Sequence, residues 1–251
     1  MSAYWSDHNI FSSINKRSFQ TRPLIIVQAR LGSTRLPGKI LMEVEGKPLL
    51  QILLERLAYV EKPVDVLVAT TELPRDDATV ACVEGQRIPC FRGKEEDVLD
   101  RFCQAVKGKS PDAIVRITAD CPLMDPWLVS RALDLFYALK VDYLSNTLHR
   151  TFPRGFDIEI FRPEVLNRAA SEATTPYDRE HVTPYIVARG NEFSQANFIS
   201  PEDLGSWRIT VDTSEDFSFV KKIVSILGSS PNTCSFTKVK ELFLQHPEWA
   251  V

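Results

Sequence analysis

Residues 24–39 read LIIVQARLGSTRLPGK, a short apolar run followed at once by a basic loop. The nearly continuous apolar run 24–29 is typical of a strand buried on both faces of a parallel sheet. Ligands of such sheets bind in the crevice beyond the carboxyl ends of the strands. We therefore expect the chemistry of this protein to begin in the loop after Ala29.

Apolar β-branched runs alternate with amphipathic segments from residue 24 to residue 139. Such alternation predicts βαβ units and a mainly parallel sheet. We therefore expect an α/β protein with a three-layer α/β/α, Rossmann-like architecture. The expected strands are 24–29, 64–69, 88–91 and 113–117, and the expected helices are 48–59, 75–84, 95–106 and 126–139.

Beyond residue 143 the alternation weakens. We expect an insertion around 145–200, carrying substrate or dimer contacts, inside a single domain that spans 23–251. Residues 1–22 are polar and aperiodic and are expected to form a flexible N-terminal tail. In this second half the expected strands are 157–161, 193–199 and 207–211, and the expected helices are 176–189, 214–227 and 238–246.

Composition excludes several classes of protein. The 251 residues carry 30 basic and 33 acidic side chains, a net charge of −3, whereas proteins that coat nucleic acid usually have a basic excess. No apolar run approaches the ~20 residues of a membrane span, and the N-terminus lacks the features of a signal peptide. The five cysteines form no CxxC pair, which indicates reduced thiols in a cytoplasmic protein. We expect neither a nucleic-acid nor a membrane partner.

The loop after the first strand places three cations, Arg30, Arg35 and Lys39, among glycine and hydroxyl residues. Glycine lets backbone amides approach a ligand closely, and arginine offers a planar fork to phosphate oxygens. The loop matches neither GxxxxGK[ST] nor GxGxxG. Its composition fits a triphosphate site and, equally, a solvated basic loop.

The loop and the motifs after it resemble, in the same order, the sugar-acid cytidylyltransferases that make CMP-3-deoxy-manno-octulosonate and CMP-acylneuraminate. The similarity is greatest to the SpsF-like branch of spore coat polysaccharide biosynthesis. It spans roughly residues 24–227 and implies the nucleotide-diphospho-sugar transferase fold. The similar segments are QARLGSTRLPGK (28–39), FRGKEEDVLDRF (91–102), VRITADCPLMDP (115–126), PRGFDIEIF (153–161), REHVTPYI (179–186) and RITVDTSEDF (208–217).

The resemblance implies a nucleotidyltransferase that joins CMP from CTP to an acidic keto-sugar and releases pyrophosphate, for surface polysaccharide biosynthesis. It also implies Mg²⁺ as cofactor and a homodimer. By the same resemblance, the side chains of Arg30, Ser33, Arg35 and Lys39 would hold the triphosphate. The backbone of Ala29, Leu31 and Gly32 would contact the base or the phosphates.

Asp120 and Asp212 each follow an expected strand. Mg²⁺ prefers one or two carboxylates together with water and phosphate oxygens, and the resemblance places metal-binding aspartates at these two motifs. Asp212 also fits a helix N-cap, and Asp120, before Pro122, also fits a turn. Together with the basic loop, the pair predicts a magnesium site.

The resemblance implies that segments near the second and third expected strands surround the nucleobase, and four residues there are candidates: Thr70, Arg75, Arg92 and Gly93. Asp97 is a candidate for the base or for the cap of its helix. The hydroxyl of Thr70 and the charge of Arg92 are equally typical of an ordinary loop and an exposed surface.

The insertion supplies the candidates for the sugar. Arg154 or Arg179 could pair with the sugar carboxylate. Asp157 and Glu159 share one face of the expected strand, because side chains alternate along strands. Glu180 and His181 share the expected helix. His181 suits a general base, but a helix histidine bonded to a neighbour is the commoner case, and His149 is a weaker candidate.

Two other functions compete with nucleotidyl transfer. A glycosyltransferase that uses a nucleotide-sugar would keep the fold, but such enzymes usually carry a DxD pair, where this chain has ADCPLMD (119–125). A non-catalytic nucleotide-binding module would bind CTP without consuming it. Release of pyrophosphate separates both alternatives from the expected reaction.

Overall fold

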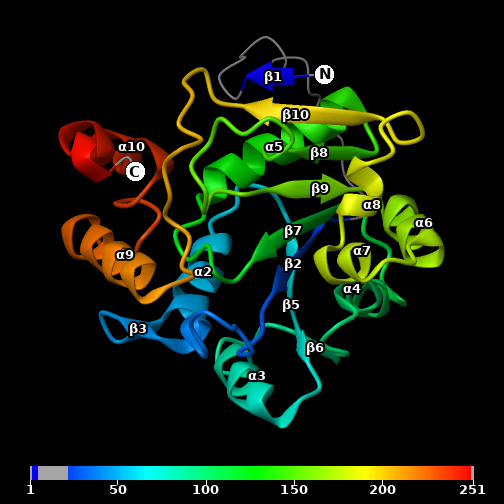
Figure 1. Cartoon of the computed structure of the whole chain (residues 1–251), viewed down its shortest axis with the longest axis horizontal. Coiled ribbons are helices and arrows are strands. Elements are labelled where there is room, and N and C mark those ends of the chain that lie inside the picture. Colours follow the sequence, from blue (N-terminus) through cyan, green and yellow to red (C-terminus); the bar gives the residue numbers. More distant parts are fainter. Residues whose placement is uncertain (1, 5–21, 250–251) are drawn as a thin grey trace.

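The computed structural model describes residues 2–4 and 22–249, and an eight-stranded sheet forms its centre (Figure 1). The strand order is β1-β10-β8-β9-β7-β2-β5-β6. Pairing is parallel except at β9, which runs antiparallel to both β7 and β8. The strands are β1 (Ser2–Tyr4), β2 (Leu24–Gln28), β5 (Asp65–Thr71), β6 (Cys90–Gly93), β7 (Ile114–Thr118), β8 (Tyr143–Ser145), β9 (Glu159–Phe161) and β10 (Gln195–Ile199).

Helices cover both faces of the sheet, as the three-layer prediction requires. Along β2, Ile25 and Val27 lie in one apolar core, while Leu24 and Ile26 lie in the other, because successive strand residues point to opposite faces. The first core packs against α2 (Leu49–Leu57), α5 (Pro126–Leu139), α9 (Ser214–Leu227) and α10 (Phe236–Gln245), and also takes Val83 of α3 (Asp77–Glu84). The second packs against α4 (Val98–Val106), α6 (Pro163–Glu172) and α8 (Pro184–Val187).

The strands predicted in the first half are confirmed to within two residues, and helix 126–139 is confirmed in full. Helix 176–189 is wrong as one element. It forms α7 (Pro176–His181) and α8, separated by Val182, whose φ of 72° breaks the helix. Pro184 cannot donate an amide to a continuing helix. Helix α6 and strand β8 escaped prediction.

The strand predicted at 207–211 is also wrong. The segment is extended but forms only an isolated bridge between Arg154 and Arg208. Its backbone groups bond to loops instead: Ile209 N donates to Arg154 O, and Val211 N donates to Asp120 O. Alternating apolar residues therefore marked burial here, not membership of the sheet.

The insertion lies in the same sheet as the rest of the chain, since it supplies β8, β9 and β10. Ser2–Tyr4, inside the segment expected to be a tail, pairs in parallel with β10. Residues 1 and 5–21 of that segment lie outside the described residues. Within the described residues, 2–4 and 22–249, no helix has the length and apolar character needed to cross a membrane.

Arg56 of α2 joins the loop after β7 to the segment between α9 and α10. It is 1% exposed, and its guanidinium donates to the carbonyl oxygens of Leu123, Met124, Ser229 and Cys234 at 2.8–3.0 Å. A planar fork with several donors can satisfy four acceptors at once.

We expect Arg56→Met to lower the free energy of unfolding by about 2–3 kcal/mol, because buried carbonyls lose their charged donor. Urea unfolding followed by circular dichroism measures the change. Arg87→Met, at a surface turn, is the control and should stay within about 0.5 kcal/mol of the parent. Equal midpoints for Arg56→Met and the parent would contradict the structural role.

Candidate active site

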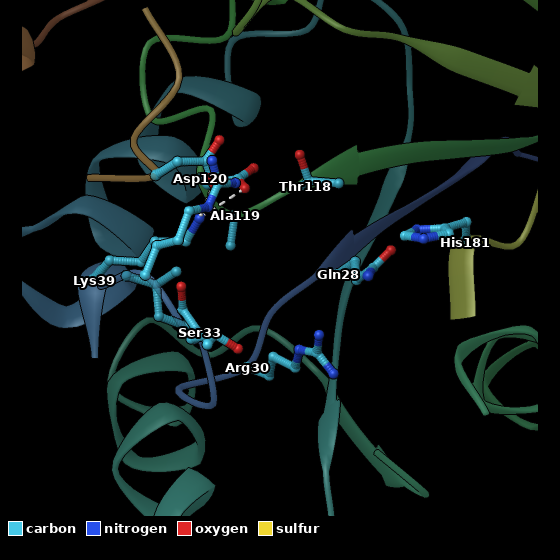
Figure 2. Close-up of a pocket in the computed structure, with 12 residues that line it drawn as sticks. Gln28, Arg30, Ser33, Lys39, Thr118, Ala119, Asp120 and His181 are labelled. Atoms are coloured by element: carbon cyan, nitrogen blue, oxygen red, sulfur yellow. Dashed lines mark hydrogen bonds and ion pairs between the residues drawn. The ribbon is translucent and has the colours of Figure 1, made fainter. Parts of the chain in front are cut away.

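A cavity of about 340 Å³ opens beyond the carboxyl ends of β2 and β7. Figure 2 shows Lys39 and Asp120 toward one end of it, and Gln28 and His181 toward the other. The position agrees with the rule for ligand sites in open α/β sheets. The residues that line the cavity are Gln28, Arg30, Ser33, Thr34, Arg35, Lys39, Ile40, Thr118, Ala119, Asp120, His181 and Asp212.

A buried carboxylate holds the basic loop in place. Asp76, which is 0% exposed, accepts a hydrogen bond from Leu31 N at 2.7 Å and another from the hydroxyl of Thr71. The loop closes on itself where Gly38, at φ 74°, donates its amide to Leu31 O. Only glycine adopts such a φ readily, so the chain can turn here and direct Lys39 into the cavity.

Lys39 bridges the two predicted metal ligands. Its Nζ lies 2.9 Å from Asp120 Oδ2 and 2.8 Å from Asp212 Oδ1. Burial lowers the pKa of Lys39, but the two carboxylates outweigh that effect, and the net pKa is raised. The ammonium therefore stays charged. The position of this ammonium is a point at which one oxygen of Asp120 and one of Asp212 converge on a single cation.

Asp212 reaches Asp120 through a close contact between loops. The amide of Val211 donates to Asp120 O, which fixes the next residue beside the end of β7. Gly155 makes this approach possible: its φ is 110°, and a Cβ there would lie 2.8 Å from the amide nitrogen of Thr210. Asp212 is thus placed by packing of an extended segment, not by the strand that the sequence predicted.

Arg208, which was not among the predicted site residues, pairs with Asp212 of the acidic pair and with Asp216. Its Nη2 lies 2.6 Å from Asp212 Oδ2 and 2.9 Å from Asp216 Oδ2. Burial raises the pKa of Asp212, but hydrogen bonds from Lys39 and Arg208 outweigh burial and lower it overall. Thr213, not Asp212, caps α9, and Asp216 completes the capping box. The N-cap interpretation of Asp212 is therefore wrong.

Two other carboxylates, Asp125 and Asp97, cap helices. Asp125 caps α5 by accepting from Trp127 N at 2.8 Å. Asp97 caps α4 by accepting from Asp100 N at 3.0 Å. Both carboxylates therefore stabilise helix N-termini.

The candidates for the nucleobase lie at the ends of β5 and β6, outside the lining of the cavity. Thr70 is buried, and its hydroxyl has no partner among the described residues. Arg92 donates to the carbonyls of Thr71 and Leu73 at 2.9 Å, which fixes the loop after β5. Arg75 pairs with Glu95, and Gly93 packs against Arg101. Their contact with a base stays a prediction.

Most of the sugar candidates are engaged with other side chains. Arg179 forms a bidentate pair with Asp97 at 2.6 and 2.9 Å, and Asp157 pairs with Arg150. Glu180 lies 3.2 Å from Arg30. Among these candidates only His181 lines the cavity. Arg154 is exposed on a loop outside the cavity lining, and Glu159 is buried in the sheet.

Gln28, Thr34, Ile40, Thr118 and Ala119 also line the cavity, and the sequence analysis did not single them out. Gln28 and Thr118 are the last residues of β2 and β7, which are adjacent parallel strands. The rule that ligands bind at strand carboxyl ends could have selected both. Arg208 carried a weaker signal, one charged residue inside an apolar segment.

The acidic cluster makes stability depend on pH. In the folded state the pKa values of Asp212 and Asp216 lie below their ordinary 3.8, since burial raises them but cationic partners lower them more. A lowered folded pKa stabilises the protein above the unfolded pKa, and this contribution is lost as pH falls through the folded value. We expect Asp216→Asn to flatten the decline of melting temperature between pH 5 and pH 3.

Thermal unfolding at half-unit pH steps measures that slope, with exposed Glu43→Gln as the control. A slope in Asp216→Asn as steep as in the parent would show that the Arg208 pair does not contribute to acid sensitivity.

The acidic pair also fits a divalent cation. Within residues 2–4 and 22–249, no group of three or more His, Cys, Asp or Glu residues could hold a metal by itself. Mg²⁺ in proteins is usually bound by one or two carboxylates together with phosphate oxygens of a ligand. Two convergent carboxylates beside a ligand would meet that preference. Asp120 and Asp212 are the residues that would hold it.

The sheet order, the helices on both faces and the cavity at the strand ends define a nucleotide-diphospho-sugar transferase fold. A family model described as cytidylyltransferase matches residues 24–247. The chain therefore belongs to the cytidylyltransferase family.

Three relatives illustrate the similarity. Spore coat polysaccharide biosynthesis protein SpsF of Bacillus subtilis is 33% identical over 234 residues, covering 90% of this chain and 96% of that protein. A cytidylyltransferase structure from Leptospira borgpetersenii has a TM-score of 0.86 at 35% identity and covers 92% of this chain and 97% of that one. CMP:2-keto-3-deoxy-manno-octonic acid synthetase complexed with CTP has a TM-score of 0.62 at 18% identity, with 82% and 99% covered, so it supports the fold alone.

Proposed function

We propose that this protein transfers CMP from CTP to an acidic keto-sugar and releases pyrophosphate, for a surface polysaccharide. The observation that carries the proposal is the single cavity that joins a triply basic loop to the Asp120–Asp212 pair. Membership of the cytidylyltransferase family supports the nucleotide. The name of SpsF supports the polysaccharide. A 3-deoxy-manno-octulosonate cytidylyltransferase of Trichlorobacter lovleyi, 34% identical over 115 residues, supports the acid.

The loop cations would bind the triphosphate. Arg30 and Arg35 present planar guanidinium groups to the cavity, and Lys39 adds a point charge. Their positive charge stabilises the negative charge that grows on the leaving pyrophosphate when an acceptor hydroxyl attacks the α-phosphorus in line. In this mechanism the chain contributes mainly position and charge.

Asp120 and Asp212 would hold Mg²⁺, and a Lewis acid bound there would polarise phosphate oxygens and lower the pKa of the attacking hydroxyl. Arg208 fixes the carboxylate of Asp212 from the side away from Lys39, since it bonds to Oδ2 while Lys39 bonds to Oδ1. The carboxylate of Asp212 is therefore oriented before a ligand arrives.

The acceptor would enter at the end of the cavity that carries Gln28 and His181 (Figure 2). His181 is exposed, and its ring packs edge-on against Tyr177 at 4.5 Å. It can contact an acceptor from α7 or take its proton. A homodimer and a cytoplasmic location stay predictions from the sequence.

Pyrophosphate release with Mg²⁺ tests the proposal, across the four nucleoside triphosphates and a panel of keto-sugar acids. The panel includes 3-deoxy-manno-octulosonate, its 8-amino-3,8-dideoxy analogue and N-acetylneuraminate. Release with CTP and one acid supports the proposed function. Binding of CTP without release for any acid would favour a binding module, and release of a nucleoside diphosphate from a nucleotide-sugar would favour a glycosyltransferase.

A further inference from the structure

A buried polar cluster lies behind the acceptor end of the cavity, with Glu159 at its centre. Glu159 is 7% exposed at the start of β9 and does not line the cavity. Its Oε1 accepts from Tyr143 OH at 2.7 Å and from Thr183 Oγ1 at 2.6 Å, while Oε2 pairs with Arg116. Burial raises the pKa of Glu159, but Arg116 and the two hydroxyls lower it overall, so the carboxylate stays ionised.

One chain of hydrogen bonds leads from Glu159 through Arg116 to Gln28. Arg116 of β7 faces Glu159 across the antiparallel pair of β7 and β9. Its Nε and Nη2 donate to Gln28 Oε1 at 3.2 and 2.9 Å. Because a guanidinium only donates, it fixes which end of the carboxamide faces it. The amide nitrogen of Gln28, without a partner among the described residues, is left as a donor for a ligand in the cavity.

A second chain of hydrogen bonds leads from Glu159 through Thr183 to His181, across a γ-turn. Thr183 N donates to His181 O at 2.8 Å, and Val182 between them has φ 72° and ψ −55°. This form of γ-turn is rare and strained, and a β-branched residue at positive φ is an outlier. Such strain persists only where the surroundings enforce it. Here the fully buried Val182 side chain and the bond from Thr183 to Glu159 supply that constraint.

We infer that Glu159 is a positioning residue that sets Gln28, through Arg116, and His181, through Thr183, at the acceptor end of the cavity. Its oxygens are occupied by three protein donors, so it does not bind the sugar itself. Gln28 then donates its amide hydrogen to an oxygen of the acceptor. This inference rests on the proposed function for the identity of the acceptor, but not for the geometry.

Thr183→Val and Tyr143→Phe each remove one hydroxyl that donates to Glu159 Oε1. The two hydroxyls lie on different elements. Thr183→Val removes the bond that links Glu159 to the turn at His181, whereas Tyr143→Phe removes a donor on β8 that lies outside the cavity lining. With the acid that the parent enzyme turns over, Thr183→Val should raise the acceptor KM about tenfold, the effect of one lost hydrogen bond to a charged group. The KM for CTP should stay within about twofold, and Tyr143→Phe should leave both within about twofold.

Thr183→Ser keeps the hydroxyl and should restore the parent KM. Equal changes of acceptor KM in Thr183→Val and Tyr143→Phe would overturn the positioning role, since they would indicate a general loss of stability. Gln28→Met keeps the length of the side chain but lacks the donor, and it should also raise the acceptor KM alone. An unchanged acceptor KM in Gln28→Met would overturn the assignment of Gln28.

Histidine ¹⁵N NMR provides a readout that needs no acceptor. The ring signal of His181, assigned from the spectrum of His181→Gln, should shift in Thr183→Val and stay in place in Tyr143→Phe. If the parent enzyme transfers CMP to no acid of the panel, the proposed function fails while this signal still decides the geometry. A His181 signal that is unmoved in Thr183→Val would overturn the inference.

Discussion

Asp212→Asn and Asp120→Asn should each lower the turnover of CTP about 10³-fold, while the fold is retained. Each substitution removes one of the two carboxylates that converge within 2.9 Å of a single cation position. Stabilisation of charge by a bound metal contributes several kcal/mol to a transition state, and each 1.36 kcal/mol corresponds to about tenfold in rate. Single-turnover formation of CMP-sugar at saturating CTP and Mg²⁺ measures the loss.

Glu215→Gln is the matched control, because it removes an exposed carboxylate three residues from Asp212 on the same segment. It should keep turnover within about twofold. Melting temperatures separate chemistry from folding, since Asp212 also pairs with Arg208. Full turnover in both asparagine variants would show that the acidic pair does not hold the metal.

The sequence predicts best where local pattern and function coincide. The apolar run at 24–28 and the basic loop after it are contiguous, so their strand and their place at the cavity follow from short-range rules. Asp120, two residues after the end of β7, followed from the same rules. Those rules needed only the order of strands and the direction in which each one ends.

Sequence patterns say least where a residue's role depends on partners far away in the chain. Glu159 was a candidate for the sugar because it shares a face of the expected strand with Asp157, and the sequence did not show that Arg116, 43 residues earlier, would pair with it. Arg179 stays a candidate for the sugar carboxylate, and its pair with Asp97, 82 residues earlier, was likewise not visible in the sequence. A charge in the sequence does not say whether a counter-charge will be buried beside it, and long-range packing decides this.

Asp212 shows both the strength and the limit of the approach. Its association with Asp120 was predicted, but through a strand that does not form. The loop contact that does place it depends on Gly155, 57 residues earlier, whose lack of a side chain admits Thr210. The conclusion about the site does not depend on the wrongly predicted strand. The predicted strand and the observed loop contact both place the carboxylate of Asp212 beside the end of β7.

Lys39→Met should uncouple metal binding from nucleotide binding. In the structure the Lys39 ammonium lies between Asp120 and Asp212, at the position that a divalent cation would take. A triphosphate, with its greater negative charge, would draw the ammonium toward its oxygens and free both carboxylates. The parent protein should therefore bind Mn²⁺ weakly until CTP is present. Lys39→Met, without the competing ammonium, should bind Mn²⁺ alone at least about tenfold more tightly, since a neighbouring like charge disfavours a cation.

Electron paramagnetic resonance of free Mn²⁺ measures this affinity with and without CTP. Arg35→Met is the control: its guanidinium lies 3.0 Å from Asp212 Oδ1 but is well exposed to water, so its removal should change Mn²⁺ affinity only slightly. Lys39→Met should also lower turnover about 10²-fold or more, because a phosphate contact that strengthens as pyrophosphate leaves is lost. If Mn²⁺ binds the parent and Lys39→Met equally well without CTP, the ammonium does not occupy the metal position. The loss of turnover would then reflect the phosphate contact alone.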